Sequence, residues 1–301
     1  MTVLNTDITV NLDGLWLLQA LLGIVRLAPE LRGRPYGEPR SGQEWLTGHP
    51  GVSVLAGQGM CDEAGVVRPD IADRMAVLAV PDVEVVGLVS RGPLTWSPQV
   101  SLDDPSTWRA VRDEQLRIVL ARRAGRWASA VRAGERITID DWRGGDADGL
   151  ARLVCEGLNS INVVEPAKFS AVNVPLVEMK DAVAQRLQAS DAGRRDAPLR
   201  SVGLRGAALA AVGAALDEPV AEAVLYARAH VDADSAMSQS VLDLRDTEAG
   251  RVAMFRLVPA RGSRQEWMSV GPATPAQVCH GVSTVLASVA VRSWETHERM
   301  R

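Results

Sequence analysis

Hydrophobic residues alternate with polar or small ones over residues 115–141, and this stretch organises the first half of the chain. Gly125 and Gly134 interrupt the alternation and divide it into three short runs. A period of two residues is typical of half-buried strands, and glycine-containing breaks of this length are typical of tight turns. The pattern therefore predicts three antiparallel strands in a meander. Apolar residues at helical spacing over 146–158 predict a helix directly after it.

The same order of elements returns near the C-terminus. A further strand pattern precedes each meander, at 81–89 and at 219–228. A weak repeat of this length indicates a duplicated, pseudo-twofold core, in which 83–158 would superpose on 221–289. A chance match of common strand patterns is the alternative. The second copy comprises three predicted strands and a helix, at 241–244, 251–258, 265–270 and 274–289.

The rest of the chain is predicted to form mostly helices and connections. Residues 190–198 are polar and are predicted to be flexible, and 230–238 are predicted to form a loop. Five arginines crowd the first meander and are expected on a solvated sheet face, or on a patch that meets an acidic partner: Arg122, Arg123, Arg126, Arg132 and Arg136. A short strand is predicted at 7–10, and helices are predicted over 13–23, in pieces within 43–60, and over 69–80, 175–187 and 204–216.

Residues 91–113 form a long connection between two predicted strands, without a sustained period. Connections of this length in a compact domain are usually functional or disordered. Pro93, Pro98 and Pro105 cannot extend a strand ladder, so the segment is expected to project from the sheet. Its tryptophans, Trp96 and Trp108, either fold back onto the protein or await a partner.

Composition narrows the class of protein. The chain has 301 residues, 47% of them hydrophobic, and a net charge of −4. Nucleic-acid-binding domains are usually basic, so a nucleic-acid partner is not expected. No apolar run of about 18 residues and no signal-peptide pattern is present, so we expect a cytoplasmic protein without stable membrane insertion. Cys61, Cys155 and Cys279 are too few and scattered for a disulfide framework or a metal site.

Catalytic and cofactor-binding motifs are missing from the sequence. It contains no G-x-S-x-G, P-loop, G-x-G-x-x-G, H-E-x-x-H or C-x-x-C, and no cofactor is expected. An enzyme would need a site assembled from scattered residues, such as His49 with Asp13 or Glu44. The acidic, glycine-rich stretch 140–149 is interpreted as a turn in which Asp146 caps the next helix.

Several segments, in their order along the chain, resemble the EspG family, the cytosolic chaperones of mycobacterial type VII (ESX) secretion systems, and most of all the member that serves the fifth ESX system. No segment is a catalytic signature, but their joint order is specific. They are DITVNLDGLWLLQA at 7–20, APELRGRPY at 28–36, EWLTGHPG at 44–51, RIVLARR at 117–123, ITIDD at 137–141, AVNVPLVEM at 171–179 and WETH at 294–297.

The resemblance implies an α+β fold with pseudo-twofold halves, at 1–161 and 162–301, in one compact body. A central antiparallel sheet would be flanked by helical bundles. It also implies a non-enzymatic chaperone that binds a PE–PPE heterodimer at the tip of the PPE subunit and keeps it soluble for secretion. The free protein would be a monomer or weak dimer. A self-associating structural subunit and an enzyme are the alternative functions.

In this family the long connection and the C-terminal helical bundle would make the contact with the partner. The connection corresponds to 91–113 by position only. The expected contact residues of the C-terminal half, which are Val202, Leu204, Leu209 and Val212, could also simply form core. The expected partner-binding residues are Leu94, Trp96, Val100, Leu102, Trp108, Val202, Leu204, Leu209 and Val212.

Overall fold

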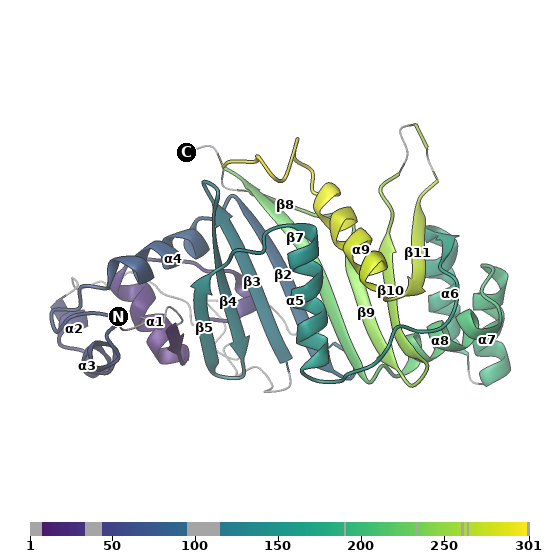
Figure 1. Ribbon diagram of the computed structural model, residues 1–301, viewed down its shortest axis with the longest axis horizontal. Helices are drawn as coiled ribbons and strands as arrows, with labels where there is room; N and C mark the ends of the chain where they lie inside the picture. Colours follow the sequence, from purple (N-terminus) through teal and green to yellow (C-terminus); the bar gives the residue numbers. More distant parts are fainter. Residues whose placement is uncertain are drawn as a thin grey trace.

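The protein is built on one 11-stranded sheet in which every pairing between strands is antiparallel (Figure 1). Its strands are β1 (Ile8–Val10), β2 (Val83–Arg91), β3 (Gln115–Arg123), β4 (Arg126–Ala133), β5 (Arg136–Asp141), β6 (Val172–Pro175), β7 (Ala221–Val231), β8 (Asp234–Met237), β9 (Leu242–Thr247), β10 (Gly250–Arg256) and β11 (Trp267–Pro272). The computed structural model describes residues 8–33, 44–94, 115–189, 191–232, 234–259, 262–263 and 265–299.

The order across the sheet is β1-β5-β4-β3-β2-β7-β9-β10-β11-β6, and β8 pairs with β7 outside this path. The predicted meanders are confirmed as β3-β4-β5 and β9-β10-β11. The longest pairing joins the two halves of the chain at the centre, where β2 runs against β7 from Val83 opposite Ala229 to Arg91 opposite Ala221.

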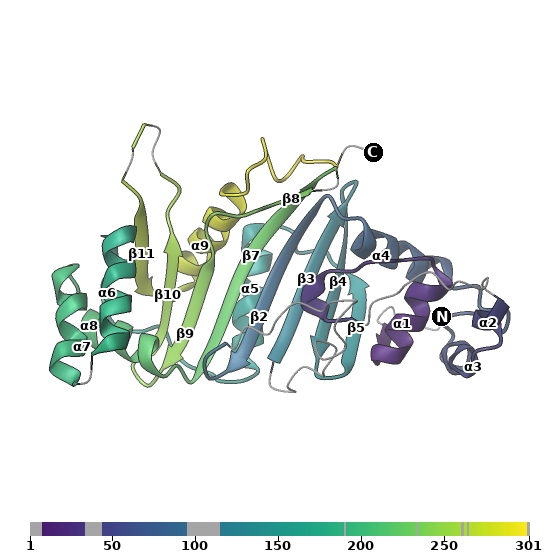
Figure 2. The same ribbon diagram turned by 180° about the vertical axis from the view of Figure 1, so that it is seen from behind.

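Helices cover the two faces of the sheet differently. They are α1 (Leu12–Leu21), the 3-10 turn η1 (Pro29–Leu31), α2 (Glu44–Thr47), α3 (Pro50–Gly57), α4 (Pro69–Ala79), α5 (Ala147–Asn159), α6 (Leu176–Gln188), α7 (Ala192–Ser201), α8 (Gly206–Asp217) and α9 (Pro275–Ala287). Helices α5 and α9 lie across the middle of one face (Figure 1). On the opposite face, α1–α4 cover one end of the sheet and α6–α8 the other (Figure 2).

The alternation of side chains along β2 and β7 explains this arrangement. Ala221, Ala223 and Leu225 point to the face of α5 and α9 and belong to one buried cluster with Leu150 of α5 and Val282 of α9. Small side chains on β7 allow both helices to approach the backbone. The opposite side of the same strands carries a separate, smaller cluster and several charged residues.

Local signals account for several boundaries. Asp146 caps α5 as expected, since its carboxylate accepts the Gly149 N–H at 2.7 Å. The predicted break at 49–51 separates α2 from α3, and Pro50 is the first residue of α3.

The polar stretch 190–198, predicted to be flexible, instead contributes to α7. Asp191 caps this helix by accepting the Arg194 N–H, and Leu199 is fully buried. Asp196 also forms an ion pair of 3.0 Å with the buried Arg186 of α6. These tertiary contacts outweigh the weak local preference of the segment for a helix.

The prediction of a loop over 230–238 is also wrong, because β7 continues to Val231 and β8 forms an antiparallel pair with β7. The edge strand β6 was not predicted. It lies against β11 with Met268 opposite Val174. β6 and β8 are both short, and backbone pairing forms these two strands although their side chains follow no clear pattern.

The arginines of the first meander do not all lie on a solvated face. Arg132 is fully buried and Arg122 is 5% exposed, whereas Arg126 is exposed beside Asp73. Arg122 donates to the carbonyl oxygens of Glu295 and His297, which ties the C-terminal segment to the sheet. The charge pattern of a strand does not reveal what covers it, so the expectation was wrong for these two residues.

The glycine turns Gly125 and Gly250 differ in their surroundings, which allows a matched test. Both have positive φ, 76° and 114°. A Cβ on Gly250 would lie 2.6 Å from backbone atoms of Ala167, whereas one on Gly125 would have no neighbour within 4 Å. We expect Gly125→Ala to cost about 1–2 kcal/mol and Gly250→Ala about 3–4 kcal/mol of unfolding free energy in urea titrations. Equal costs would contradict the close approach of the 160–171 connection.

Candidate partner-binding surface

The centre of the face opposite α5 and α9 lies between the two helical bundles. Among the described residues, no α-helix crosses β2 and β7 there (Figure 2). Val86, Leu88, Val224 and Tyr226 form a small buried cluster on these strands, and Leu94 packs against it. The predicted residue Leu94, at the start of the long connection, therefore lies over the joint between the halves.

A chain of polar contacts links Leu94 to the C-terminal bundle. The Leu94 N–H donates to the Glu222 carboxylate at 2.7 Å. The other carboxylate oxygen of Glu222 lies 3.0 Å from Arg245, which also donates to the carbonyl oxygen of Ala215 in α8 at 3.1 Å. The structure thus brings together the start of the connection and α8, which are more than one hundred residues apart in sequence.

A second ionic network holds the turn η1 on this face. Arg228 of β7 bonds both carboxylate oxygens of Glu30, and the Tyr226 hydroxyl donates to the same group at 2.6 Å. Arg228 and His230 also contact the carboxylate of Glu84. Burial raises the pKa of Glu84, but these two partners outweigh it, so the pKa of this carboxyl is lowered overall.

Asp243 lies beside Arg245, with which its carboxylate makes two contacts of 3.0 Å. Burial raises the pKa of Asp243 to about 6, against the opposing effect of the Arg245 guanidinium and with a smaller contribution from Glu222. Asp243 is therefore a carboxyl whose pKa lies well above its ordinary value.

The C-terminal residues predicted to bind the partner divide by burial. Leu204 and Val212 are fully buried and Leu209 is 8% exposed; all three belong to the core of the α6–α8 bundle. Val202 packs against this core and is half-buried in the turn that leads to α8. Trp96, Val100, Leu102 and Trp108 lie outside the described residues.

The polar residues of this surface were missed by the sequence reasoning. Glu84, Glu222 and Arg228 occupy strands whose other residues are mostly apolar. A charged residue in such a strand needs a partner if it is buried. That signal could have identified them, although not their partners.

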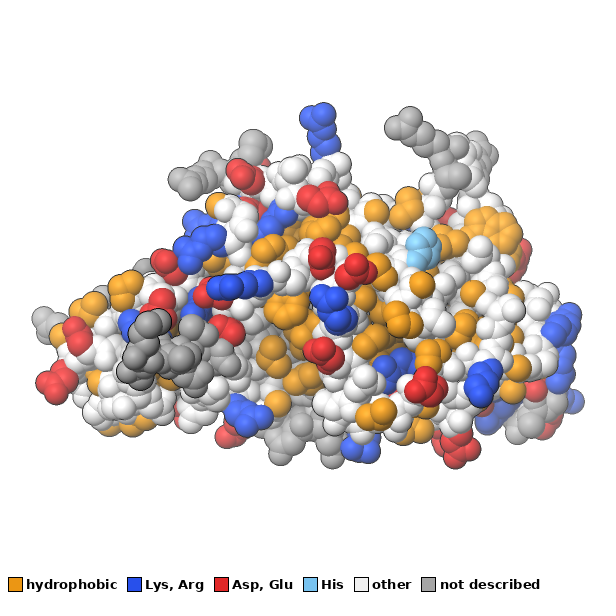
Figure 3. Space-filling model, in the orientation of Figure 1, with side chains coloured by type: hydrophobic (Ala, Val, Ile, Leu, Met, Phe, Trp, Pro, Cys, Tyr) orange, Lys and Arg blue, Asp and Glu red, His pale blue; other side chains and the backbone are white. Residues whose placement is uncertain are grey.

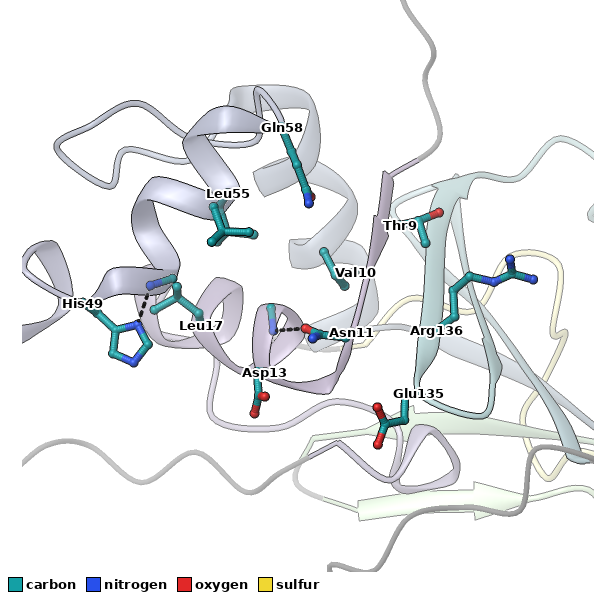
Figure 4. Close-up of a pocket in the computed structure, with 13 residues that line it drawn as sticks. Thr9, Val10, Asn11, Asp13, Leu17, His49, Leu55, Gln58, Glu135 and Arg136 are labelled. Carbon is teal, nitrogen blue, oxygen red and sulfur yellow. Dashed lines mark hydrogen bonds between the residues drawn. The ribbon is translucent and has the colours of Figure 1, made fainter.

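A cavity of about 510 Å³ lies in the N-terminal bundle, away from the surface described above. It is bounded by α1, α3, β1 and the turn between β4 and β5 (Figure 4). His49 and Asp13 both line it, but the His49 ring caps α3, with Nδ1 accepting the Gly51 N–H at 3.1 Å. Figure 4 shows the ring and the carboxylate on different elements, not directed at each other. The side chain of Glu44 is outside the described part.

The other face of the molecule has a mixed surface. Hydrophobic side chains there are scattered among charged ones around α5 and α9 (Figure 3). Within the described ranges, no group of three or more His, Cys, Asp or Glu residues could hold a metal ion. No single described helix is long and apolar enough to cross a membrane; Arg194–Ser201 and Gly206–Asp217 reach that length only together and are bent by 119°.

The model of the EspG family matches residues 11–284. The chain belongs to the EspG family. This EspG chain is 44% identical over 296 residues to the ESX-5 secretion-associated protein EspG5 of Mycobacterium marinum, with 98% of each chain covered. It is 43% identical to EspG5 of Mycobacterium tuberculosis over the same share of both chains.

One solved structure has a TM-score of 0.86 and 42% identity to this EspG protein, and covers 97% of this chain and 100% of its own. It contains the Mycobacterium tuberculosis type VII secretion system chaperone EspG5 in complex with the PE25–PPE41 dimer. The family resemblance inferred from the sequence is confirmed, and so is the expectation of a chaperone family and not an enzyme.

The pKa of Asp243 gives a testable pH dependence. Because its folded pKa is raised, its contribution to stability is full below about pH 4 and is lost as the pH rises through 6. Asp243→Asn removes this loss. The free energy of unfolding of the variant, relative to that of the wild type, should therefore rise by roughly 2–3 kcal/mol between pH 4 and pH 7. Denaturant titrations at fixed pH measure the difference. A difference in unfolding free energy between the variant and the wild type that does not change with pH would show that Arg245 compensates fully for the burial of Asp243.

Proposed function

We propose that this protein is a cytosolic chaperone that binds a PE–PPE heterodimer through the tip of the PPE subunit and keeps it soluble for secretion by an ESX-5 system. The observation that carries the proposal is the close likeness over nearly the whole chain to a chaperone solved with PE25–PPE41. As a free protein it would be a monomer or weak dimer.

We place the PPE contact on the surface that joins Leu94, Glu222 and the α7–α8 turn. The connection that begins at Leu94 would contribute Trp96, Val100, Leu102 and Trp108. From the C-terminal bundle, Val202 is the residue available for direct contact because it is partly exposed. The buried side chains Leu204, Leu209 and Val212 would support the shape of this bundle.

We further propose that 1–161 and 162–301 arose by duplication and form one pseudo-twofold body. The strand order supports this, because it reads β2-β3-β4-β5 in one direction from the central pairing and β7-β9-β10-β11 in the other. A helix follows each meander, α5 in one half and α9 in the other. Superposition of the halves with matching order and direction is the test.

Co-expression with PE–PPE pairs, followed by co-purification, tests the chaperone function. We expect Val202→Asp to abolish complex formation and to leave the melting temperature nearly unchanged. Val163→Asp is the matched control, because Val163 is 83% exposed and lies in the connection after α5. Retained binding by Val202→Asp would remove this turn from the interface. A collapse of its melting temperature would assign Val202 to the core. Failure of every pair to co-purify, with homo-oligomers present instead, would favour a self-associating subunit.

The tryptophans of the long connection provide a separate test. Tryptophan is favoured at interface hot spots because it buries a large rigid surface. Trp96→Ala or Trp108→Ala should cost roughly 2–3 kcal/mol of binding, or about 30- to 150-fold in affinity for the cognate heterodimer. Titration calorimetry measures this.

Trp45→Ala is the control for these variants, because Trp45 packs against Trp16 in the N-terminal bundle at a centroid distance of 5.7 Å. It should lower stability without lowering affinity. Unchanged affinity in both Trp96→Ala and Trp108→Ala would exclude the connection as the recognition element.

A further inference from the structure

Two arginines face each other under η1 in an unusual way. Arg117 of β3 and Arg132 of β4 are directly opposite in the strand register and are 7% and 0% exposed. Like charges directly opposite one another destabilise a sheet, and buried charges need partners. A buried pair of this kind therefore needs compensation.

The hydrogen bonds of the pair go to neutral groups. Arg132 donates to the carbonyl oxygens of Leu31, Arg32 and Gly134, at 2.5, 2.8 and 2.6 Å. Arg117 donates to the carbonyl oxygen of Glu30 at 3.2 Å and to the side-chain oxygen of Gln115 at 2.6 Å. These bonds fix both guanidinium groups against the turn but supply no negative charge.

One nitrogen on each guanidinium is buried and makes no hydrogen bond to a described residue. Nε of Arg117 and Nη2 of Arg132 have no hydrogen-bond acceptor among the described residues. Unsatisfied buried donors are rare in folded proteins, and each calls for a bound water or ion. Two such donors on neighbouring like charges favour an anion over a water molecule. Water would satisfy the donors but would leave the positive charge of the two guanidinium groups uncompensated.

The nearby carboxylates supply only part of the missing charge, because burial and neighbouring arginines lower the pKa of Arg117 and of Arg132 more than Glu30 and Glu135, respectively, raise it. The Glu30 carboxylate is bonded to Arg228 and Tyr226, and the Glu84 carboxylate to Arg228 and His230. Arg117, Arg132 and Arg228 therefore share this region with two carboxylates that Arg228 already engages. Burial, with Arg117 and Arg32 adding to it, lowers the pKa of Arg132 to about 10, which agrees with an excess of positive charge.

We propose that Arg117 and Arg132 bind a small monovalent anion of the size of chloride, held by Nε of the first and Nη2 of the second. The site lies beneath η1, so the anion would brace this turn against β3 and β4. Its ligand is small because both side chains are almost wholly buried. The site adjoins the candidate partner surface through η1, and it stabilises the free protein.

Thermal unfolding in sodium chloride and in sodium gluconate, at equal sodium concentration, tests the proposal. Gluconate is too large for an enclosed site. An anion that binds only the folded state should raise the melting temperature in chloride by about 2 °C for each tenfold rise above its Kd. Arg117→Gln should lose this increment. Arg126→Gln, at an exposed position of β4, should keep it.

Equal melting temperatures of the wild type in the two salts would overturn the proposal. So would an undiminished chloride increment in Arg117→Gln. If that variant does not fold, crystals of the wild-type protein grown in bromide decide. An anomalous peak within hydrogen-bond distance of both guanidinium groups is expected, and a structure with water or no density there would refute the anion.

Discussion

The pairing of β2 with β7 is the contact on which the rest of the structure depends. It is the only long ladder between the two halves in the described chain, and it runs from Val83 opposite Ala229 to Arg91 opposite Ala221. Its backbone hydrogen bonds fix the register of the whole sheet, because each meander extends outward from one member of the pair. A shift of one residue here would turn the apolar side chains of both strands to the wrong face.

The two faces of this pair have different roles. One face carries small and branched apolar side chains and is closed by α5 and α9, one helix from each half. The opposite face carries Glu84, Glu222 and Arg228 beside a small apolar cluster. Burial of these charges is tolerated because Glu30 and Arg245 come from other elements to meet them. The ionic contacts fix η1 and the start of the long connection at the joint.

The parts that meet at this joint come from distant segments of the chain. The region between the bundles combines a small buried apolar cluster with paired charges. Its parts come from both halves of the chain, since Leu94 precedes the first meander and α8 precedes the second. The Glu222–Arg245 contacts hold these parts in one geometry.

Local chemistry in the sequence was sufficient to predict both meanders, the helices that follow them, the cap at Asp146 and the turns at Gly125 and Gly250. Alternation, helical spacing, capping and positive φ act over a few residues, so they can be read without knowledge of the fold. The order of the segments that resemble the EspG family was not needed for these elements, only for the family resemblance. The same local signals failed for α7 and β8, whose formation depends on tertiary contacts.

Only the tertiary structure decided the placement of the charged residues. The sequence could not distinguish the buried Arg132 from the exposed Arg126, because both lie in the same strand and their surroundings come from η1 and α4. It could not pair Glu30 with Arg228 or Leu94 with Glu222, which are separated by 198 and 128 residues. Nor could it separate the partly exposed Val202 from the buried Val212. A side chain's partners and burial are set by the elements that fold against it, and those come from distant parts of the chain.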